Sequence, residues 1–285
     1  MSNLTKIRVG GVPEHFNLPW HLAIENGLFE KEGIEVEWTV FKGGTGQMTR
    51  ALRKNEIDVC ILLTEGIIAD IVNGNPAKLI GKYLNTPLIW GVYTGIHNSV
   101  TQYGEIYDKQ YAISRFGSGS HLMPIVDANS KKIKLKHSQF EVIKNLDGAL
   151  ESLATNATDA FYWEKYTTKP YVDSGLLKHL GDYVTPWPCF MMAATNSVLE
   201  RAHKSIERLK RVIYFTTKQF MTSPTAIKEV SERYHQKIED VEAWFHATEW
   251  STNDDISDKL LENVLHTLKV AEIIEYKPAL SSFRA

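Results

Sequence analysis

Seven consecutive residues, from Arg115 to His121, bring together several groups that bind anions. They read Arg-Phe-Gly-Ser-Gly-Ser-His and precede a helix-forming stretch. An arginine supplies charge-assisted hydrogen bonds, and the first turn of a helix supplies free backbone N–H groups. A flexible helix cap would account for the glycines and serines alone. We predict that an anion is held here by Arg115, Gly117, Ser118, Ser120 and His121.

A second glycine-rich segment, Lys42–Gly46, also precedes a helix-forming stretch. Backbone N–H groups at Gly44 and Thr45 would hold a carboxylate, sulfonate or phosphate, and a plain turn is the alternative interpretation. A nucleotide-binding P-loop ends in Gly-Lys-Ser/Thr, whereas Gln47 follows the last glycine here. The pattern therefore argues against a nucleotide phosphate loop.

Carboxylate and aromatic side chains complete the candidate site. Thr64 and Glu65 follow an apolar strand, where the carboxylate either accepts hydrogen bonds from an amine, amidine or aminopyrimidine or caps the next helix. Aromatic rings suit a ligand with a flat or apolar body, although the same rings could pack a helix onto a sheet. The candidates are His15, Phe16, Trp20 and Trp187.

Other catalytic patterns are weak. A serine lies beside His121, but the Gly-x-Ser-x-Gly motif of serine hydrolases is missing. The ten histidines show no paired spacing typical of a metal site, and two cysteines cannot form a four-cysteine zinc site. We expect no metal and no cofactor. An acid–base pair of His15 or His121 with Glu65 or Glu164 is the catalytic alternative.

Composition describes an ordinary globular chain of 285 residues, with 23% charged residues, 43% hydrophobic residues and a net charge of -2. Nothing in it suggests a nucleic acid or an anionic membrane as partner. No apolar run is long enough for a membrane span, and the start lacks a signal-peptide pattern. We expect a cytoplasmic location, or a periplasmic or lipid-anchored one if a leader was removed.

The elements that must position these groups alternate between strand and helix. Apolar patterns predict strands at residues 6–12, 34–40, 57–63, 78–83 and 88–94, with helices between the first four. The alternation restarts near residue 110, with strands at 110–114, 140–143, 159–162 and 176–180. Residues 190–195 form a strand that could return to the first sheet, and helices follow from Ser197. Such α/β sheets place ligands at the carboxyl ends of their strands.

The first third of the chain resembles type II periplasmic-binding-protein-like proteins. The resemblance is carried by Arg-Val-Gly-Gly-Val at 8–12, Pro-Trp-His-Leu-Ala at 19–23, Gly-Leu-Phe-Glu-Lys-Glu-Gly-Ile-Glu-Val at 27–36 and Asn-Glu-Ile-Asp-Val at 55–59. It implies a two-domain α/β clamshell with mixed sheets flanked by helices. Residues 1–93 and 187–285 would form domain one and residues 94–186 domain two, with crossovers near 93–95 and 185–189.

The family includes sulfonate, taurine and nitrate binding components of ABC importers, and fungal synthases of the thiamine pyrimidine precursor. The resemblance implies an aromatic–acidic pair at Trp163 and Glu164, and Glu65 or Glu164 would accept from a ligand donor. It places Leu62 and Gly66 where the synthases have the lysine that holds pyridoxal phosphate and a histidine. Leucine offers no amine for a Schiff base, so we expect binding without catalysis.

The resulting hypothesis is a cytosolic protein that closes two lobes around a small polar, anionic ligand. An exported component of an ABC importer, with a permease as partner, is the first alternative. An enzyme related to thiamine-pyrimidine biosynthesis on the same scaffold is the second.

Overall fold

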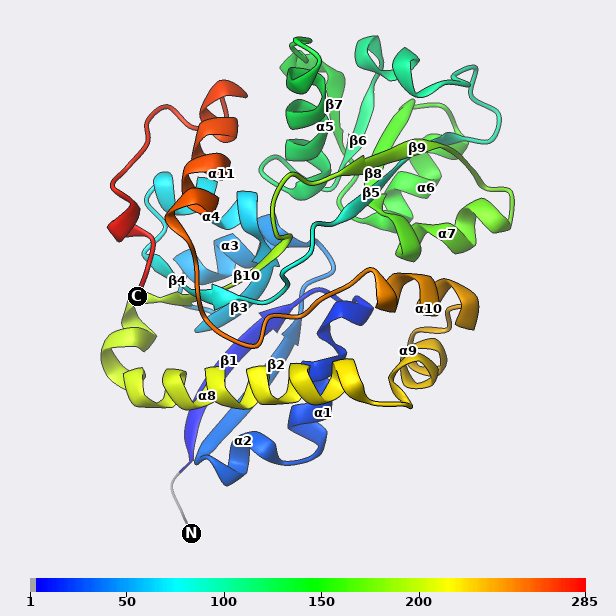
Figure 1. The fold of residues 1–285 in the computed structure, drawn as a ribbon. Coiled ribbons are helices and arrows are strands. Elements are labelled where there is room, and N and C mark those ends of the chain that lie inside the picture. The colour runs from blue at the N-terminus through cyan, green and yellow to red at the C-terminus, as the bar shows by residue number, and fades with distance from the viewer. Residues whose placement is uncertain (1–3) are drawn as a thin grey trace.

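The computed structural model describes residues 4–285 as two lobes, each built on a five-stranded sheet (Figure 1). The strand order is β2-β1-β3-β10-β4 in the first sheet and β7-β6-β8-β5-β9 in the second. Both sheets mix parallel and antiparallel pairs and are flanked by helices. This is the predicted α/β two-lobe architecture. Residues 1–3, the predicted beginning of domain one, lie outside the described part.

The first sheet is completed by a strand from late in the chain. Its strands are β1 (Thr5–Gly11), β2 (Ile34–Val40), β3 (Val59–Leu63), β4 (Ala77–Lys82) and β10 (Phe190–Thr195). β10 lies antiparallel between β3 and β4, which confirms the predicted returning strand. Every residue of β3 and β10 is buried, because helices cover both faces of these central strands.

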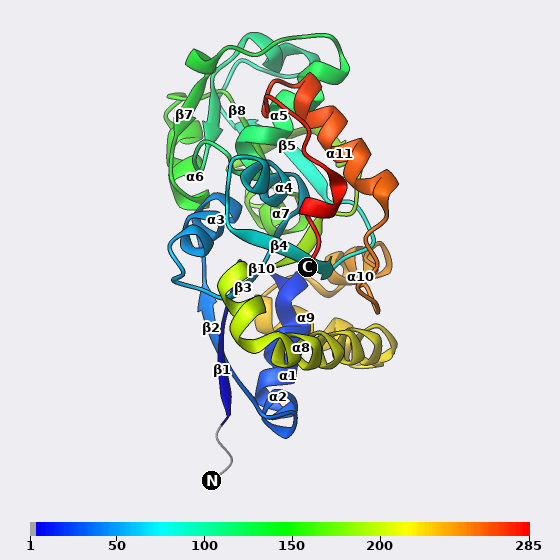
Figure 2. The same cartoon turned by 90° about the vertical axis from the view of Figure 1, so that its left-hand side faces the viewer.

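The helices of the first lobe come from both ends of the chain. They are α1 (Leu18–Glu25), α2 (Leu28–Lys31), α3 (Thr45–Arg53), α4 (Thr64–Val72), α8 (Asn196–Thr222), α9 (Ala226–Tyr234), α10 (Ile238–His246) and α11 (Asp258–Val270), with short 3₁₀ turns at η1 (His15–Asn17) and η4 (Leu280–Ser282). The apolar stripe of α8, which includes Ile206, Leu209 and Ile213, is buried. Figure 2 shows α11 reaching from the first lobe alongside α5 (Gly119–Ser130) of the second.

The second lobe is continuous in sequence. It contains β5 (Ile89–Gly95), η2 (Tyr103–Asp108), β6 (Tyr111–Ile113), α5, η3 (His137–Gln139), β7 (Phe140–Val142), α6 (Leu146–Ala154), β8 (Ala160–Glu164), α7 (Lys165–Asp173) and β9 (Leu177–Val184). Asn145 caps α6, because its side chain accepts a hydrogen bond from Gly148 N at 3.0 Å. Pro170 lies inside α7 without ending it.

Two chain segments, residues 83–88 and 185–189, connect the lobes. β5 pairs with β8 and β9, so the predicted first crossover near residues 93–95 lies too late in the chain. An apolar run such as 88–94 suits either sheet, and its partners alone decide which sheet it joins. The second crossover falls between the end of β9 and the start of β10, where it was predicted. Thr185 N donates to Leu88 O and Cys189 N to Thr86 O, each at 3.0 Å, so the two crossovers also pair with each other.

Trp187 in the second crossover holds a buried acid of the first lobe. Its Nε1 donates to Glu65 Oε2 at 2.9 Å, and both side chains are buried. Within residues 4–285, Glu65 Oε1 has no hydrogen-bond partner. Burial raises the pKa of Glu65 to about 7, and the bond from Trp187 opposes that rise.

Trp187→Phe should destabilise the protein by about 1–3 kcal/mol, because a buried acceptor loses its donor. The decrease in the free energy of unfolding should be larger at pH 8 than at pH 5. At pH 8 Glu65 is mostly charged, and a buried carboxylate loses more by losing its donor than the neutral acid does. Urea denaturation at both pH values measures this. In a Glu65→Gln background the Trp187→Phe effect should not vary with pH; a pH-independent effect in the wild-type background would contradict the assignment.

Candidate functional site

A cavity of about 230 Å³ lies between the lobes, and we call it the interlobe cavity. Its walls are loops at the carboxyl ends of strands from both sheets, together with the crossover residue Leu88 and the first residues of the antiparallel strands β5 and β10. The first lobe contributes Val12, Pro13, Glu14, Lys42, Gly44, Thr45, Leu63 and Phe190, and the second contributes Trp90, Ser114, Ser118, Gly119, Ser120, Asn145, Leu146, Asp147, Trp163, Glu164 and Thr167. Neither lobe alone provides a complete site.

Apolar and aromatic side chains form the body of the cavity, including Leu63, Trp90, Trp163 and Phe190. Trp163 stacks on Phe161 with centroids 5.2 Å apart. The lobes approach closely at Gly119: a Cβ there would lie 2.3 Å from Leu63 Cδ1 in the opposite lobe. Any larger residue at Gly119 would push the lobes apart or displace the cavity wall.

Four helices begin at the interlobe cavity. Side chains cap two of them: Asn145 caps α6, and Glu164 accepts from Tyr166 N and Thr167 N at the start of α7. Within residues 4–285, no side chain caps the first turns of α3 and α5. These two N-termini therefore offer N–H donors to an acceptor group of a ligand.

The serine hydroxyls at the start of α5 are partly occupied in holding their own loop. Ser118 Oγ donates to Arg115 O at 2.7 Å, and Ser114 N donates to Ser120 Oγ at 2.9 Å. Similarly, Thr45 Oγ1 accepts from Leu63 N at 3.1 Å. These bonds fix the two uncapped helix starts against strand ends, so their backbone N–H groups are preorganised.

Acidic residues outnumber basic ones in the lining. Glu14, Asp147 and Glu164 face the cavity, whereas Lys42 is the one basic side chain among the described lining residues. Burial, and then the charge of Glu164, raises the pKa of Glu14 to about 8. Burial also raises the pKa of Glu164, against the hydrogen bonds it accepts from Thr167 and Tyr166. The charge of an acid in one lobe thus acts on an acid of the other lobe.

A second hollow of about 220 Å³ continues from the first. The two share Pro13, Glu14, Leu146 and Thr167. Among residues 4–285, three of its buried polar atoms lack a partner: His15 Nε2, Tyr234 Oη and Gln236 Oε1. Burial lowers the pKa of His15 to about 3, so its ring is neutral. A polar extension of a ligand, or water, would satisfy these atoms.

The structure distributes the predicted site residues over four places: the interlobe cavity, the second hollow, the protein interior and a separate groove. Those that line the interlobe cavity are Gly44, Thr45, Ser118, Ser120, Trp163 and Glu164. His15 lines only the second hollow.

Five predicted residues pack in the protein interior, outside both hollows. Phe16 lies against Phe190 and Trp244, and Trp20 is stacked on Phe29. Thr64 Oγ1 donates to Pro188 O at 2.5 Å, and Glu65 and Trp187 bind each other. Large aromatic rings near a strand end serve a core as readily as a ligand, and here Phe16 and Trp20 stabilise the first lobe.

Arg115, Gly117 and His121 line a separate groove rather than the interlobe cavity. Gly117 adopts φ +79°, and this left-handed residue turns the chain between Arg115 and Ser118. The arginine and the serines, adjacent in sequence, therefore face different hollows.

Several lining residues were not predicted: Glu14, Trp90, Asn145, Asp147, Tyr234 and Gln236. Glu14 lies in the loop whose neighbours His15 and Phe16 were singled out, and Asn145 and Asp147 lie at the start of α6. Trp90 was missed because β5 was assigned to the other lobe. Tyr234 and Gln236 come from the distant α9–α10 region, and no local pattern marks them.

Residues 4–285 contain no cluster of three or more metal-binding side chains. Within the same residues, no helix combines the length and apolarity needed to cross a bilayer.

Comparisons with known proteins agree with this architecture. Residues 90–183 match the family model described as Ca3427-like PBP. The structure of the Candida albicans CA3427 gene product, described as defining a new family with the generic periplasmic binding protein fold, aligns over 99% of this chain and 96% of its own. It has a TM-score of 0.92 and 26% identity.

Sulfonate-binding proteins share the fold at lower identity. The alkanesulfonate-binding protein SsuA from Xanthomonas axonopodis pv. citri, bound to MOPS, has a TM-score of 0.78 and 12% identity, covering 96% of each chain. The periplasmic aliphatic sulphonate binding protein SsuA from Escherichia coli has a TM-score of 0.72 and 13% identity, covering 98% of this chain and 97% of its own. No curated protein matches the sequence.

The pKa of Glu14 makes stability depend on pH. Because its pKa is higher in the folded state, the folded protein holds this proton more tightly, and that stabilisation is lost as pH rises from about 4.5 to 8. Glu14→Gln should remove this loss, so the variant should gain up to about 4 kcal/mol relative to wild type between pH 5 and pH 8.5. Thermal denaturation across this range measures the difference, with exposed Glu35→Gln as control. Parallel curves for wild type and Glu14→Gln would show that Glu14 is charged and solvated.

Proposed function

Because this chain belongs to the type II periplasmic-binding-protein-like family, we propose that it binds a small organic molecule between its lobes and closes around it. The observation that carries the proposal is the interlobe cavity of about 230 Å³, walled by strand-end loops of both sheets. A ligand there contacts both lobes only when they are together, so binding favours closure.

The lining indicates an amphipathic ligand. Trp90, Trp163 and Phe190 fit a flat or apolar body, and Glu14 with Glu164 fits a hydrogen-bond donor or cationic group. The uncapped starts of α3 and α5 fit an acceptor at the other end. An aminopyrimidine or a small aromatic amine has this combination of groups.

An anionic ligand has less support at this position. The prediction of an anion depended on Arg115, which lines the other groove, and three acids here face Lys42 alone. The fold likeness to proteins that bind sulfonates nevertheless makes a sulfonate the second candidate, held at the uncapped helix starts. Uptake through a permease and sensing in the cytoplasm are both compatible roles for such binding.

A thermal-shift screen of the full chain should separate the two ligand classes. We expect aminopyrimidines and aromatic amines to raise Tm by mass action, and taurine and MOPS to raise it less. Small-angle scattering should show a smaller radius of gyration with the ligand that raises Tm. A Tm raised by sulfonates alone would favour the second candidate.

Trp163→Ala should weaken the binding of that ligand about tenfold or more, because a ring that packs on the ligand body is lost. The matched control is Phe215→Ala, an exposed aromatic residue on α8 that is 57% accessible. Isothermal titration calorimetry of both variants measures the effect. Equal affinity of Trp163→Ala and wild type would remove the interlobe cavity as the binding site.

A further inference from the structure

A third hollow, the arginine groove, has a volume of about 730 Å³ and also lies between the lobes. The same two loops that wall the interlobe cavity form it: Gly46 and Gly117 line the groove, whereas their neighbours Thr45 and Ser118 line the cavity. The groove is therefore separated from the proposed ligand only by these loops.

Two arginines from opposite lobes meet at this groove. Arg50 lies on α3 of the first lobe and Arg115 follows β6 of the second. Arg50 Nε donates to Gly46 O at 3.2 Å, and a Cβ on Gly46 would lie 2.8 Å from Arg115 Cδ. Both side chains thus contact the same glycine, one from each lobe.

Neither arginine is neutralised by the described part of the chain. Within residues 4–285 neither forms an ion pair, and Arg115 Nε is buried without a hydrogen-bond partner. Burial, followed by the charge of Arg50, lowers the pKa of Arg115. A buried donor without a partner and two adjacent like charges are both unfavourable unless an anion satisfies them.

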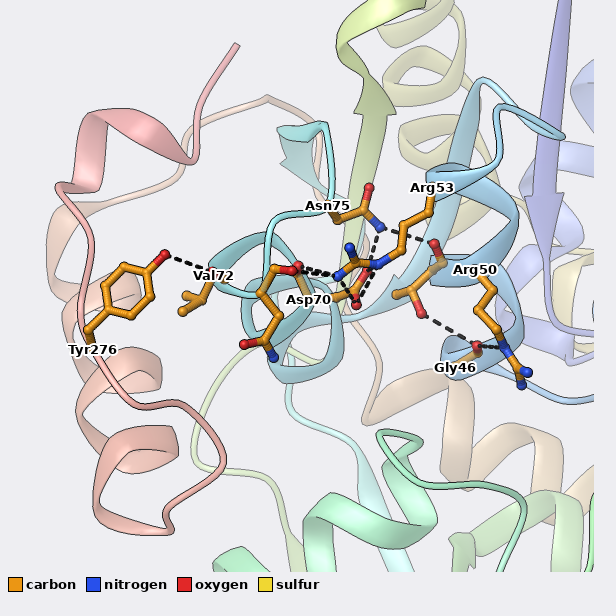
Figure 3. Close-up of polar contacts among 9 residues, drawn as sticks. Gly46, Arg50, Arg53, Asp70, Val72, Asn75 and Tyr276 are labelled. Carbon is orange, nitrogen blue, oxygen red and sulfur yellow. Dashed lines mark hydrogen bonds and ion pairs between the residues drawn. The ribbon is translucent and has the colours of Figure 1, made fainter.

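The acids that line the groove are already engaged. Asp70 accepts from Arg53 Nη2 at 2.7 Å and from Arg53 Nε at 3.2 Å, and it also binds Asn75. Figure 3 shows Arg53 lying over Asp70, whereas the guanidinium of Arg50 lies beside Gly46 and away from this pair. Glu272 pairs with Lys134 at 2.5 Å.

We propose that the arginine groove binds an oxyanion of the phosphate type between Arg50 and Arg115, and that this anion holds the two lobes together. Guanidinium groups bind phosphate oxygens with charge-assisted, often bidentate hydrogen bonds. An anion between the two cations replaces repulsion across the groove with attraction to both. The site is distinct from the interlobe cavity. Its role in holding the lobes together rests on the closure proposed above, to which a bound anion would add.

The probes are inorganic phosphate and pyrophosphate, titrated into the full chain at constant ionic strength. We expect Tm to rise with either anion, and Arg50→Ala and Arg115→Ala each to weaken binding at least tenfold in calorimetry. The matched control is Arg211→Ala, an exposed arginine on α8 of the first lobe, which should bind phosphate as the wild type does. Undiminished phosphate binding by the Arg50→Ala, Arg115→Ala double variant would overturn the site.

Two further measurements separate this site from the ligand cavity. Phosphate should still bind the Trp163→Ala variant, whatever that change does to the organic ligand; loss of binding there would place the anion in the interlobe cavity and overturn the proposal. The radius of gyration should fall when phosphate is added to the wild type but not to the double variant. Binding without any change in the radius of gyration would overturn the lobe-holding role. Circular dichroism of each variant verifies folding, and Arg115→Gln serves if Arg115→Ala does not fold.

Discussion

The pairing of the two crossovers is the constraint on which the rest of the structure depends. Thr185 N and Cys189 N donate to Leu88 O and Thr86 O, so the chain passes between the lobes at one narrow place. β5 begins directly after the first crossover, and β10 begins directly after the second. The strand ends of the two sheets therefore face each other on either side of the paired crossovers. The candidate binding residues of both lobes lie at those strand ends, or in the loops and first helical turns next to them.

Local patterns in the sequence were sufficient to predict most elements and a second α/β unit after residue 110, whereas the two-lobe architecture was implied by the resemblance to type II periplasmic-binding-protein-like proteins. Alternation in 34–40 predicted β2, and the apolar run 190–195 predicted a returning strand. The membership of β5 was not predictable in this way, because Trp90 pairs with Glu164 and Tyr183, residues more than 70 positions away. Hydrophobicity specifies that such a strand is buried, and non-local pairing specifies where.

The candidate site was predicted only in part, for a related physical reason. Segments such as 42–46 and 115–121 were identified because glycines and hydroxyls before a helix are a local signal. The direction in which each side chain points was not predictable from that signal. Gly117 has a left-handed backbone conformation, and it therefore directs Arg115 and Ser118 into different hollows. Likewise Phe16 and Trp20 have the residue types of a binding wall but the surroundings of a core. Residue type indicates which chemistry is available, and loop geometry decides where it acts.

The late arrival of β10 has a consequence for how the chain folds during synthesis. The first sheet remains open between β3 and β4 until residues 190–195 leave the ribosome, whereas the strands of the second sheet lie within residues 89–184. The second lobe can therefore complete its sheet first, while two strand edges of the nascent first lobe stay unpaired and prone to aggregation. A chain interrupted before β10 would expose those edges permanently.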